Sequence, residues 1–257
     1  MAVITSLACG PQATNQGNAG QTLLINGTDL TGATTARIGS RTVPATVNGD
    51  GTQVTCTVPG GCGIQNVTVT ATSGTSNALP FYYIAAPVLS GVSPAEISAE
   101  TPGSVTISGN GLLTTNQVSF NGDPTAATPT INSDGSVTVT PDALTPVGAN
   151  PWFQPVSVAV RTAGGTATLA NAATAYDTPV IDSLDPATGP AGIEVEIEGE
   201  AFVSDAIQVT FDGVQAAFTA VSDTQLLAIA PAGPTGAVDV VVITPGGTSA
   251  PATFTYT

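Results

Sequence analysis

Short runs in which apolar and polar residues alternate follow one another along the chain, separated by Gly, Pro, Asp and Ser. A period of two is typical of a β-strand with one buried face, as in Glu194–Glu200, where Val195 and Ile197 alternate with glutamates. No window has the 3.6-residue apolar period of an amphipathic helix. The pattern therefore predicts an all-β protein of many short strands, arranged as a sandwich or barrel.

The same order of strands and turns occurs three times, with a period of roughly 80–90 residues. Each repeat has an opening strand, a strand that ends at a polar residue and Gly, a hairpin with a tight Gly turn, and a closing strand. The opening strands lie at 2–9, 87–94 and 179–186, the Gly-ended strands at 23–30, 105–112 and 195–202, and the hairpins at 36–45, 117–126 and 208–217.

A period of this length fits tandem domains, which we expect at residues 1–85, 86–177 and 178–257. The joints between them, at 81–89 and 175–184, contain Pro and lack the Gly- and Ser-rich length of a flexible linker. Such joints predict an extended rod.

This order of motifs resembles the IPT/TIG family of immunoglobulin-like domains. The third repeat is the most similar, the first matches well, and the second matches at both ends but carries an insertion. The resemblance implies three tandem immunoglobulin-like β-sandwich domains. It implies little about activity, because such domains serve in surface receptors, adhesins, secreted enzymes and phage particles.

The charges are distributed unevenly among the 257 residues, whose net charge is −15. Two acids balance Arg37 and Arg41 in residues 1–85, six acids accompany Arg161 in 86–177, and ten acids with no base lie in 178–257. A neutral first domain is a candidate docking domain, and the acidic third domain would stay solvated at the distal end. The alternative is that the acidic charge only keeps the protein soluble. Either way, nucleic acid is a poor partner.

The chain contains no His and no Lys. Their absence excludes Ser-His-Asp and Cys-His nucleophilic pairs, imidazole metal ligands, Schiff-base lysines and Ser-Lys dyads. A pair of carboxylates of the glycosidase type stays compatible with the composition, but the short loops of a sandwich leave little room for a cleft. We therefore expect no enzyme activity, no cofactor and no metal.

One candidate site is an acidic stripe on the strand 194–200. Alternation places its four carboxylates on one face, spaced roughly 6.5–7 Å apart, and the residues are Glu194, Glu196, Glu198 and Glu200. The stripe could dock a basic partner or hold a cation. A solvated outer face is the simpler interpretation, because a row this spread cannot chelate one ion.

Two of the three cysteines form a candidate disulfide. Cys9 lies in the loop after the first strand and Cys62 in the loop between the fifth and sixth strands, and these loops share one pole of a seven-strand sandwich. In the third repeat the same positions are Pro186 and Pro234. A Cys9–Cys62 bridge would contribute about 2–4 kcal/mol and would indicate an oxidising setting.

The third cysteine, Cys56, alternates with Val54 and Val58 and is expected to be a buried free thiol. A Cys56–Cys62 pair is an alternative, although it would join the interior of a strand to a loop.

The middle repeat differs from the others in its loop Pro141–Val156, which is longer than the corresponding stretch of the third repeat and contains the only Trp. Trp152 and Phe153 lie between Pro151 and Pro155. Such a pair could be a rigid apolar knob that contacts a sugar ring or a pocket of a partner protein. The alternative is a plug over the open end of the sandwich or over the joint with the first domain.

The first functional hypothesis is a structural, adhesive accessory of an assembled particle, such as a phage decoration or tail protein in the virion. The first domain would dock on the capsid or tail, and host surface glycans are further candidate partners. The alternative is a secreted or cell-surface adhesion or carbohydrate-binding module, or the accessory domains of a polysaccharide-active enzyme. We expect no membrane insertion, since no apolar run reaches 18 residues. We also expect no signal peptide before the first strand.

Overall fold

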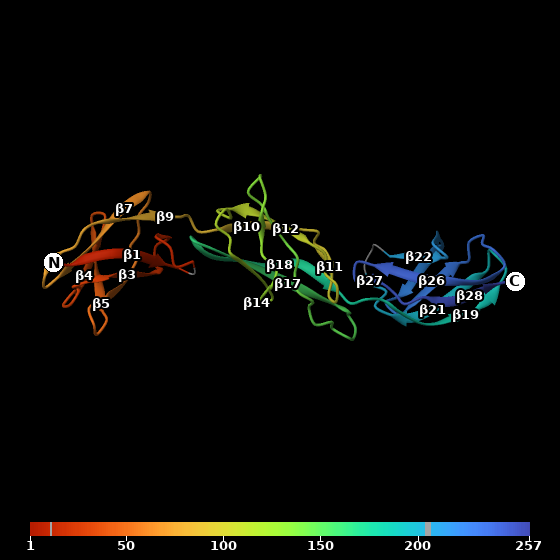
Figure 1. Ribbon diagram of the computed structural model, residues 1–257. Coiled ribbons are helices and arrows are strands. Elements are labelled where there is room, and N and C mark those ends of the chain that lie inside the picture. The colour runs from red at the N-terminus through yellow and green to blue at the C-terminus, as the bar shows by residue number, and fades with distance from the viewer. Residues whose placement is uncertain (11, 204–206) are drawn as a thin grey trace. The chain divides into compact units, whose positions relative to one another are not determined.

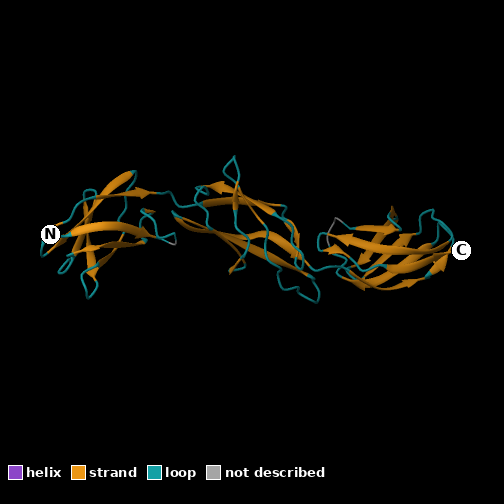
Figure 2. Cartoon of the chain, viewed as in Figure 1, coloured by secondary structure: helices purple, strands orange, loops and turns teal. Residues whose placement is uncertain are grey.

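The computed structural model describes residues 1–10, 12–203 and 207–257 of the chain (Figure 1). In these residues the backbone forms strands, turns and loops, with no helix (Figure 2). The strands form sheets within three consecutive stretches of sequence, which confirms the predicted all-β class. The boundaries of the three domains and the extended rod stay predictions.

The chain divides into two compact units. Met1–Gly91, Thr106–Val139 and Val158–Leu169 form the first unit, and Val92–Val105, Thr140–Ser157 and Ala170–Thr257 form the second. The middle repeat therefore contributes residues to both units.

The first repeat forms one sheet in the order β1-β3-β6-β5-β4-β7-β9-β2, with β8 paired to β7. Strand β5 pairs with β6 and with β4, so the sheet folds over an apolar core. Leu23 and Ile25 of β3 share this core with Val67 and Val69 of β7. The strands are β1 (Val3–Cys9), β2 (Gln16–Gly17), β3 (Thr22–Thr28), β4 (Thr35–Ile38), β5 (Arg41–Val47), β6 (Gln53–Thr57), β7 (Ile64–Ala71), β8 (Gly74–Thr75) and β9 (Leu79–Tyr83).

The middle repeat contributes two sheets, β10-β12-β16-β15 and β11-β18-β17-β13-β14. Every second residue of β17 is buried from Val156 to Val160, as expected for a strand with one apolar face. The strands are β10 (Val88–Ser93), β11 (Glu96–Ser98), β12 (Val105–Asn110), β13 (Gln117–Phe120), β14 (Asp123–Pro124), β15 (Thr130–Ile131), β16 (Val137–Val139), β17 (Phe153–Thr162) and β18 (Gly165–Tyr176).

The third repeat forms two sheets that pack as a sandwich, β19-β21-β25-β24 and β20-β28-β26-β22-β23, with β27 paired to β26. Val195 and Ile197 of β21 lie in one buried cluster with Phe211, Val240 and Phe254 of the opposite sheet. The strands are β19 (Val180–Asp185), β20 (Thr188–Gly189), β21 (Glu194–Glu200), β22 (Gln208–Phe211), β23 (Val214–Gln215), β24 (Ala217–Ser222), β25 (Gln225–Ile229), β26 (Gly236–Thr244), β27 (Gly247–Thr248) and β28 (Ala252–Tyr256).

The middle and third repeats begin with a chain segment that changes sheets. In the third repeat, β19 pairs antiparallel with β21, whereas β20 pairs parallel with the last strand, β28. The same parallel pairing joins β2 to β9 and β11 to β18. Because β19 and β20 belong to different sheets, the start of the repeat connects the two layers of the sandwich.

The predicted tight turns are present. Asn121 and Gly122 have φ angles of 51° and 94°, and Asp212 and Gly213 have φ angles of 48° and 77°. Two successive residues in the left-handed region are the signature of the type I′ hairpin turn, for which Asn-Gly and Asp-Gly are preferred. These turns connect β13 to β14 and β22 to β23.

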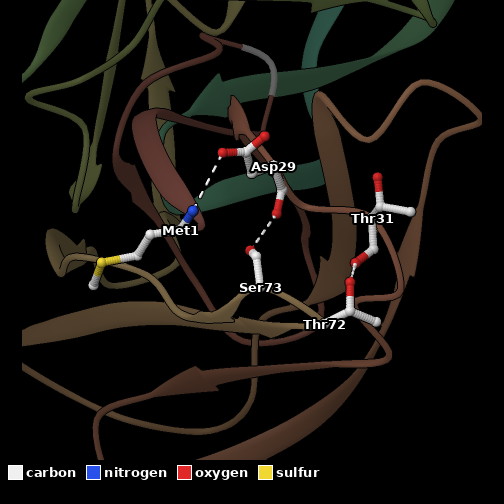
Figure 3. Close-up of polar contacts among 5 residues, drawn as sticks. All are labelled: Met1, Asp29, Thr31, Thr72 and Ser73. Carbon is white, nitrogen blue, oxygen red and sulfur yellow. Dashed lines mark hydrogen bonds and ion pairs between the residues drawn. The ribbon is translucent and has the colours of Figure 1, made fainter.

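The N-terminal end of the first repeat is fastened by polar contacts around Asp29 (Figure 3). The amino group of Met1 lies 3.4 Å from the Asp29 carboxylate, and the Ser73 hydroxyl donates to the Asp29 carbonyl at 2.9 Å. Beside them, the Thr72 hydroxyl donates to the Thr31 carbonyl at 2.9 Å. The ion pair is solvent-exposed and contributes little, so the two hydroxyl–carbonyl bonds are the stronger link between these loops.

A glycine lies against the opening strand in every repeat. A Cβ at Gly27 would overlap the Val3 carbonyl oxygen, and a Cβ at Gly199 would overlap the Val180 carbonyl oxygen. In the middle repeat, Gly109 is approached in the same way by the carbonyl oxygen of Val88. Only glycine allows the two backbones to come this close.

We predict that Gly109→Ala lowers the free energy of unfolding by about 1–3 kcal/mol, because the added methyl group forces β10 away from β12. Gly103→Ala is the matched control, since a Cβ at Gly103 meets no atom within 4 Å. Denaturant unfolding of both variants measures the difference. Equal stability of the two variants would contradict the close approach.

Candidate functional site

The loop between β16 and β17, residues 140–152, is the longest connection of the middle repeat. The corresponding connection of the third repeat, between β25 and β26, covers only residues 230–235. The predicted loop Pro141–Val156 ends earlier than expected, because Phe153–Val156 already belong to β17. The loop therefore delivers Trp152 and Phe153 to the very start of a strand.

Trp152 is buried, with 9% of its surface exposed. Its indole packs with Ala201 and Val203, and Tyr176 lies against this cluster. Its backbone N–H donates to the Ala149 carbonyl at 2.7 Å. The prediction that Trp152 forms an exposed knob is therefore wrong, because the apolar contacts with Ala201 and Val203 remove the ring from solvent. The contacts that bury the ring come from the third repeat, and a plug over the open end of the sandwich or over the joint with the first domain stays a prediction.

The loop is held in place by the buried carboxylate of Asp177, a residue within the predicted joint at 175–184. Asp177 Oδ1 accepts from the Val147 N–H at 2.9 Å, and Oδ2 accepts from the Gly148 N–H at 2.7 Å. The Asp177 N–H also donates to the Trp152 carbonyl at 3.0 Å. Hydrogen bonds to a charged acceptor are the stronger kind, so Asp177 connects the end of β18 to both halves of the loop.

Phe153, in contrast, is 40% exposed. Its ring centroid lies 5.8 Å from that of Tyr176, at an interplanar angle of 41°. Next to it, the Gln154 amide donates to the Thr145 carbonyl at 2.7 Å, which fixes the start of β17 to the loop. Phe153 is thus the member of the predicted aromatic pair that reaches the surface.

Tyr176 differs from the tyrosines that end the other two repeats. The Tyr83 and Tyr256 hydroxyls donate to the Pro59 and Pro231 carbonyls, at 2.8 and 2.5 Å. In both repeats a loop glycine lies against the ring, where an added Cβ would be 2.6 Å from a ring atom. Burial raises the pKa of both hydroxyls. The Tyr176 hydroxyl instead donates to the exposed Glu96 carboxylate at 3.1 Å.

Tyr176 lines a groove of about 400 Å³, a volume within the range of small-molecule sites. The groove combines aromatic, apolar and acidic side chains, with the hydroxyl of Ser222. Asp223 at its edge accepts from the Asn150 amide at 3.3 Å, so the long loop also reaches this groove. Its lining residues are Glu96, Tyr176, Phe202, Ile207, Ala220, Val221, Ser222 and Asp223.

The family profile of the IPT/TIG domain matches residues 2–83, 87–176 and 179–256. The chain belongs to the IPT/TIG family. The resemblance inferred from the strand and turn motifs is thereby confirmed, and each repeat corresponds to one IPT/TIG domain.

Similar solved structures include the full extracellular region of plexin A4, at 15% identity over 95% of this chain and 23% of that one, with a TM-score of 0.45. They also include SGBP-B from a xyloglucan utilization locus of Bacteroides uniformis, at 17% identity over 94% of this chain and 66% of that one, with a TM-score of 0.32.

The chain spans less than two thirds of the length of these proteins. At such identities the likeness concerns the fold alone and carries no functional argument. No curated protein sequence matches the chain.

The acidic stripe lies on β21 of the third IPT/TIG domain. Strand β21 is flanked by β19 and β25, so the stripe is on an inner strand rather than at an edge. The Gln225 amide donates to both Glu196 and Glu198, the second bond being 2.9 Å long. Glu194 and Glu200, at the ends of the strand, are exposed. Docking of a basic partner on this stripe stays a prediction.

The three cysteines of the first IPT/TIG domain are free thiols, so the predicted Cys9–Cys62 disulfide is corrected. Cys9 points into the core, where its Sγ lies 3.6 Å from Gln21 Oε1, whereas Cys62 is exposed. Cys56 is buried and free, as its alternation with valines indicated. Cys9 and Cys56 are not placed for a bridge either, because Leu23 pairs with Cys9 on one side and with Cys56 on the other. The strand between these two cysteines keeps their Cα atoms too far apart.

Two negative findings apply to the described ranges 1–10, 12–203 and 207–257. These residues contain no group of three or more acidic or Cys side chains placed to hold a metal ion. They also contain no helix with the length and apolar character needed to cross a membrane.

Removing the carboxylate of Asp177 should release the long loop. We expect Asp177→Ala to destabilise the loop by about 1.5–3 kcal/mol, the usual contribution of a hydrogen bond to a charged group, and to expose Trp152. A red shift in the fluorescence of this single tryptophan measures the exposure. Asp182→Asn, an exposed carboxylate on β19, is the control, and the same red shift in both variants would contradict the role of Asp177.

Thiol labelling distinguishes the three cysteines. Burial raises the pKa of Cys9 to about 11, and burial together with the neighbouring Cys9 raises the pKa of Cys56 to about 11. Since both thiols therefore stay protonated at pH 8, we expect a disulfide reagent to modify only Cys62 in the folded protein and all three thiols in urea. Rapid modification of a second thiol without urea would disprove this arrangement.

Proposed function

We propose that this protein is a non-catalytic adhesion protein that binds glycans at an extracellular or cell surface, through the groove beside Phe153 and Tyr176. The groove is lined by Glu96 and Tyr176 of the middle IPT/TIG domain and by side chains of the third, up to Asp223.

The observation that carries the proposal is the different environment of Tyr176. In the first and third domains the equivalent tyrosine is used structurally, covered by Gly61 or Gly233 and bonded to a proline carbonyl. In the middle domain the inserted loop replaces this cover with Phe153, and Tyr176 lines a groove. A long inserted loop usually has a functional role, and here it reaches the groove through Asn150.

The chemistry of the groove suits a sugar. Binding sites combine apolar and aromatic surfaces with a few polar groups that fix orientation. The exposed ring of Phe153 offers an apolar face for the C–H side of a pyranose, and the carboxylates of Glu96 and Asp223 accept hydrogen bonds from its hydroxyls.

A binding role also fits the absence of His and Lys from the sequence. The two groove carboxylates are each engaged by a neighbouring donor, Glu96 by the Tyr176 hydroxyl and Asp223 by the Asn150 amide. We therefore propose that they bind hydroxyl groups without cleaving a glycosidic bond. The particle-accessory hypothesis, with the first domain docked on a capsid or tail, stays a prediction.

A glycan array followed by calorimetry tests the proposed function. We expect Phe153→Ala to weaken binding at least tenfold, because it removes the exposed ring. Leu113→Ala is the control, since Leu113 is 69% exposed, also lies in the middle domain and is no part of the groove lining. Failure of the unmodified protein to bind any glycan, or full binding by folded Phe153→Ala, would refute the proposal.

A further inference from the structure

We propose that the groove selects neutral, hydroxyl-rich glycans and rejects glycans that carry carboxylate or sulfate groups. This inference rests on the proposed glycan-binding function and names the class of sugar that the site accepts. Three independent properties of the groove support it: the sign of its charges, the direction of its hydrogen bonds and the shape of its aromatic surface.

All charged side chains in the lining of the groove are acidic. They are Glu96 and Asp223, and none of the lining residues that the structure describes is Arg or Lys. The third domain, residues 178–257, contains no cation at all, and the one Arg of the middle domain, Arg161, lies at the far end of β17 from Phe153. An anionic ligand would therefore meet two like charges, and the third domain contains no cation to offset their repulsion.

The hydrogen-bonding groups of the groove also favour a neutral sugar over an anionic one. An ionised carboxylate only accepts hydrogen bonds. Glu96 already accepts from the Tyr176 hydroxyl and Asp223 from the Asn150 amide, and their remaining lone pairs can take only further donors, such as those of a ligand. The hydroxyls of a neutral sugar supply such donors. A uronate or sulfate group supplies acceptors, which would face the acceptors of the groove and leave both sides without partners after they lose water.

The aromatic part of the groove favours an uncharged ring. Tyr176 of the lining is inclined at 41° to Phe153, which lies beside the groove and not in its lining, and a pyranose could contact these two rings through its C–H groups. Stacking of this kind requires the sugar to give up its hydration shell, and a charged substituent on the ring raises the cost of that step.

The experiment compares sugars that differ only in charge. Oligogalacturonides and their methyl esters have the same backbone, and cello-oligosaccharides serve as a second neutral probe. Binding to the full chain is measured by calorimetry and by the fluorescence of Trp152, which packs against Tyr176. We expect the acidic oligogalacturonide to bind at least tenfold more weakly than its methyl ester, with a smaller gap in high salt because salt screens the repulsion.

Two sets of variants identify the source of the selectivity. Glu96→Gln combined with Asp223→Asn should reduce the gap between the two sugars to less than threefold. Asp182→Asn combined with Asp239→Asn removes the same number of charges from exposed positions outside the groove lining and should leave the gap unchanged.

Equal or tighter binding of the acidic sugar by the unmodified protein would overturn this inference and leave the proposed function standing. A gap that closes equally in both sets of variants would also overturn it, since the selectivity would then come from net charge. If none of the glycans on an array of neutral and acidic sugars binds, the proposed function fails, and this inference fails with it.

Discussion

The close approach of a glycine to the opening strand is the constraint on which each repeat depends. Gly27, Gly109 and Gly199 each lie where a Cβ would overlap a carbonyl oxygen of the strand that starts the repeat. The neighbouring register is irregular as well, since a bulge separates Ile4 from Ser6 in the pairing of β1 with β3. The third repeat has the same bulge between Ile181 and Ser183. These features fix the position at which the chain enters the sandwich, and so the position at which the next strand can cross to the other sheet.

Much of this arrangement could be predicted from local sequence. Alternation placed Val195 and Ile197 inside and the glutamates outside, and Asn-Gly and Asp-Gly marked type I′ turns, because both effects depend on residues next to one another. Cys56 was predicted as buried for the same reason. The repeats added a second source of information, since a position that is clear in the third repeat identifies its counterpart in the first.

The candidate site was less predictable, because it depends on contacts between residues far apart in the sequence. Trp152 and Phe153 are neighbours of similar chemistry, yet Ala201 and Val203 bury the first while the second stays exposed. Nothing in the local pattern around Asp177 indicates that its carboxylate accepts from Val147 and Gly148. The disulfide prediction failed similarly, because two loops at one pole do not determine whether a side chain such as Cys9 points inward.

Tyr176 shows how an inserted loop can change the contacts of a residue position that all three repeats share. In the first and third domains, a short loop lies between β6 and β7 or between β25 and β26. This loop provides both the glycine that covers the tyrosine ring and the carbonyl that accepts from its hydroxyl. The longer loop of the middle domain is instead anchored on Asp177, and the Tyr176 hydroxyl turns to Glu96. The buried Trp152 packs with Ala201 and Val203, and the half-buried Tyr176 lies against this cluster while Phe153 stays exposed. A surface made in this way needs no change in the strands of the sandwich that supports it.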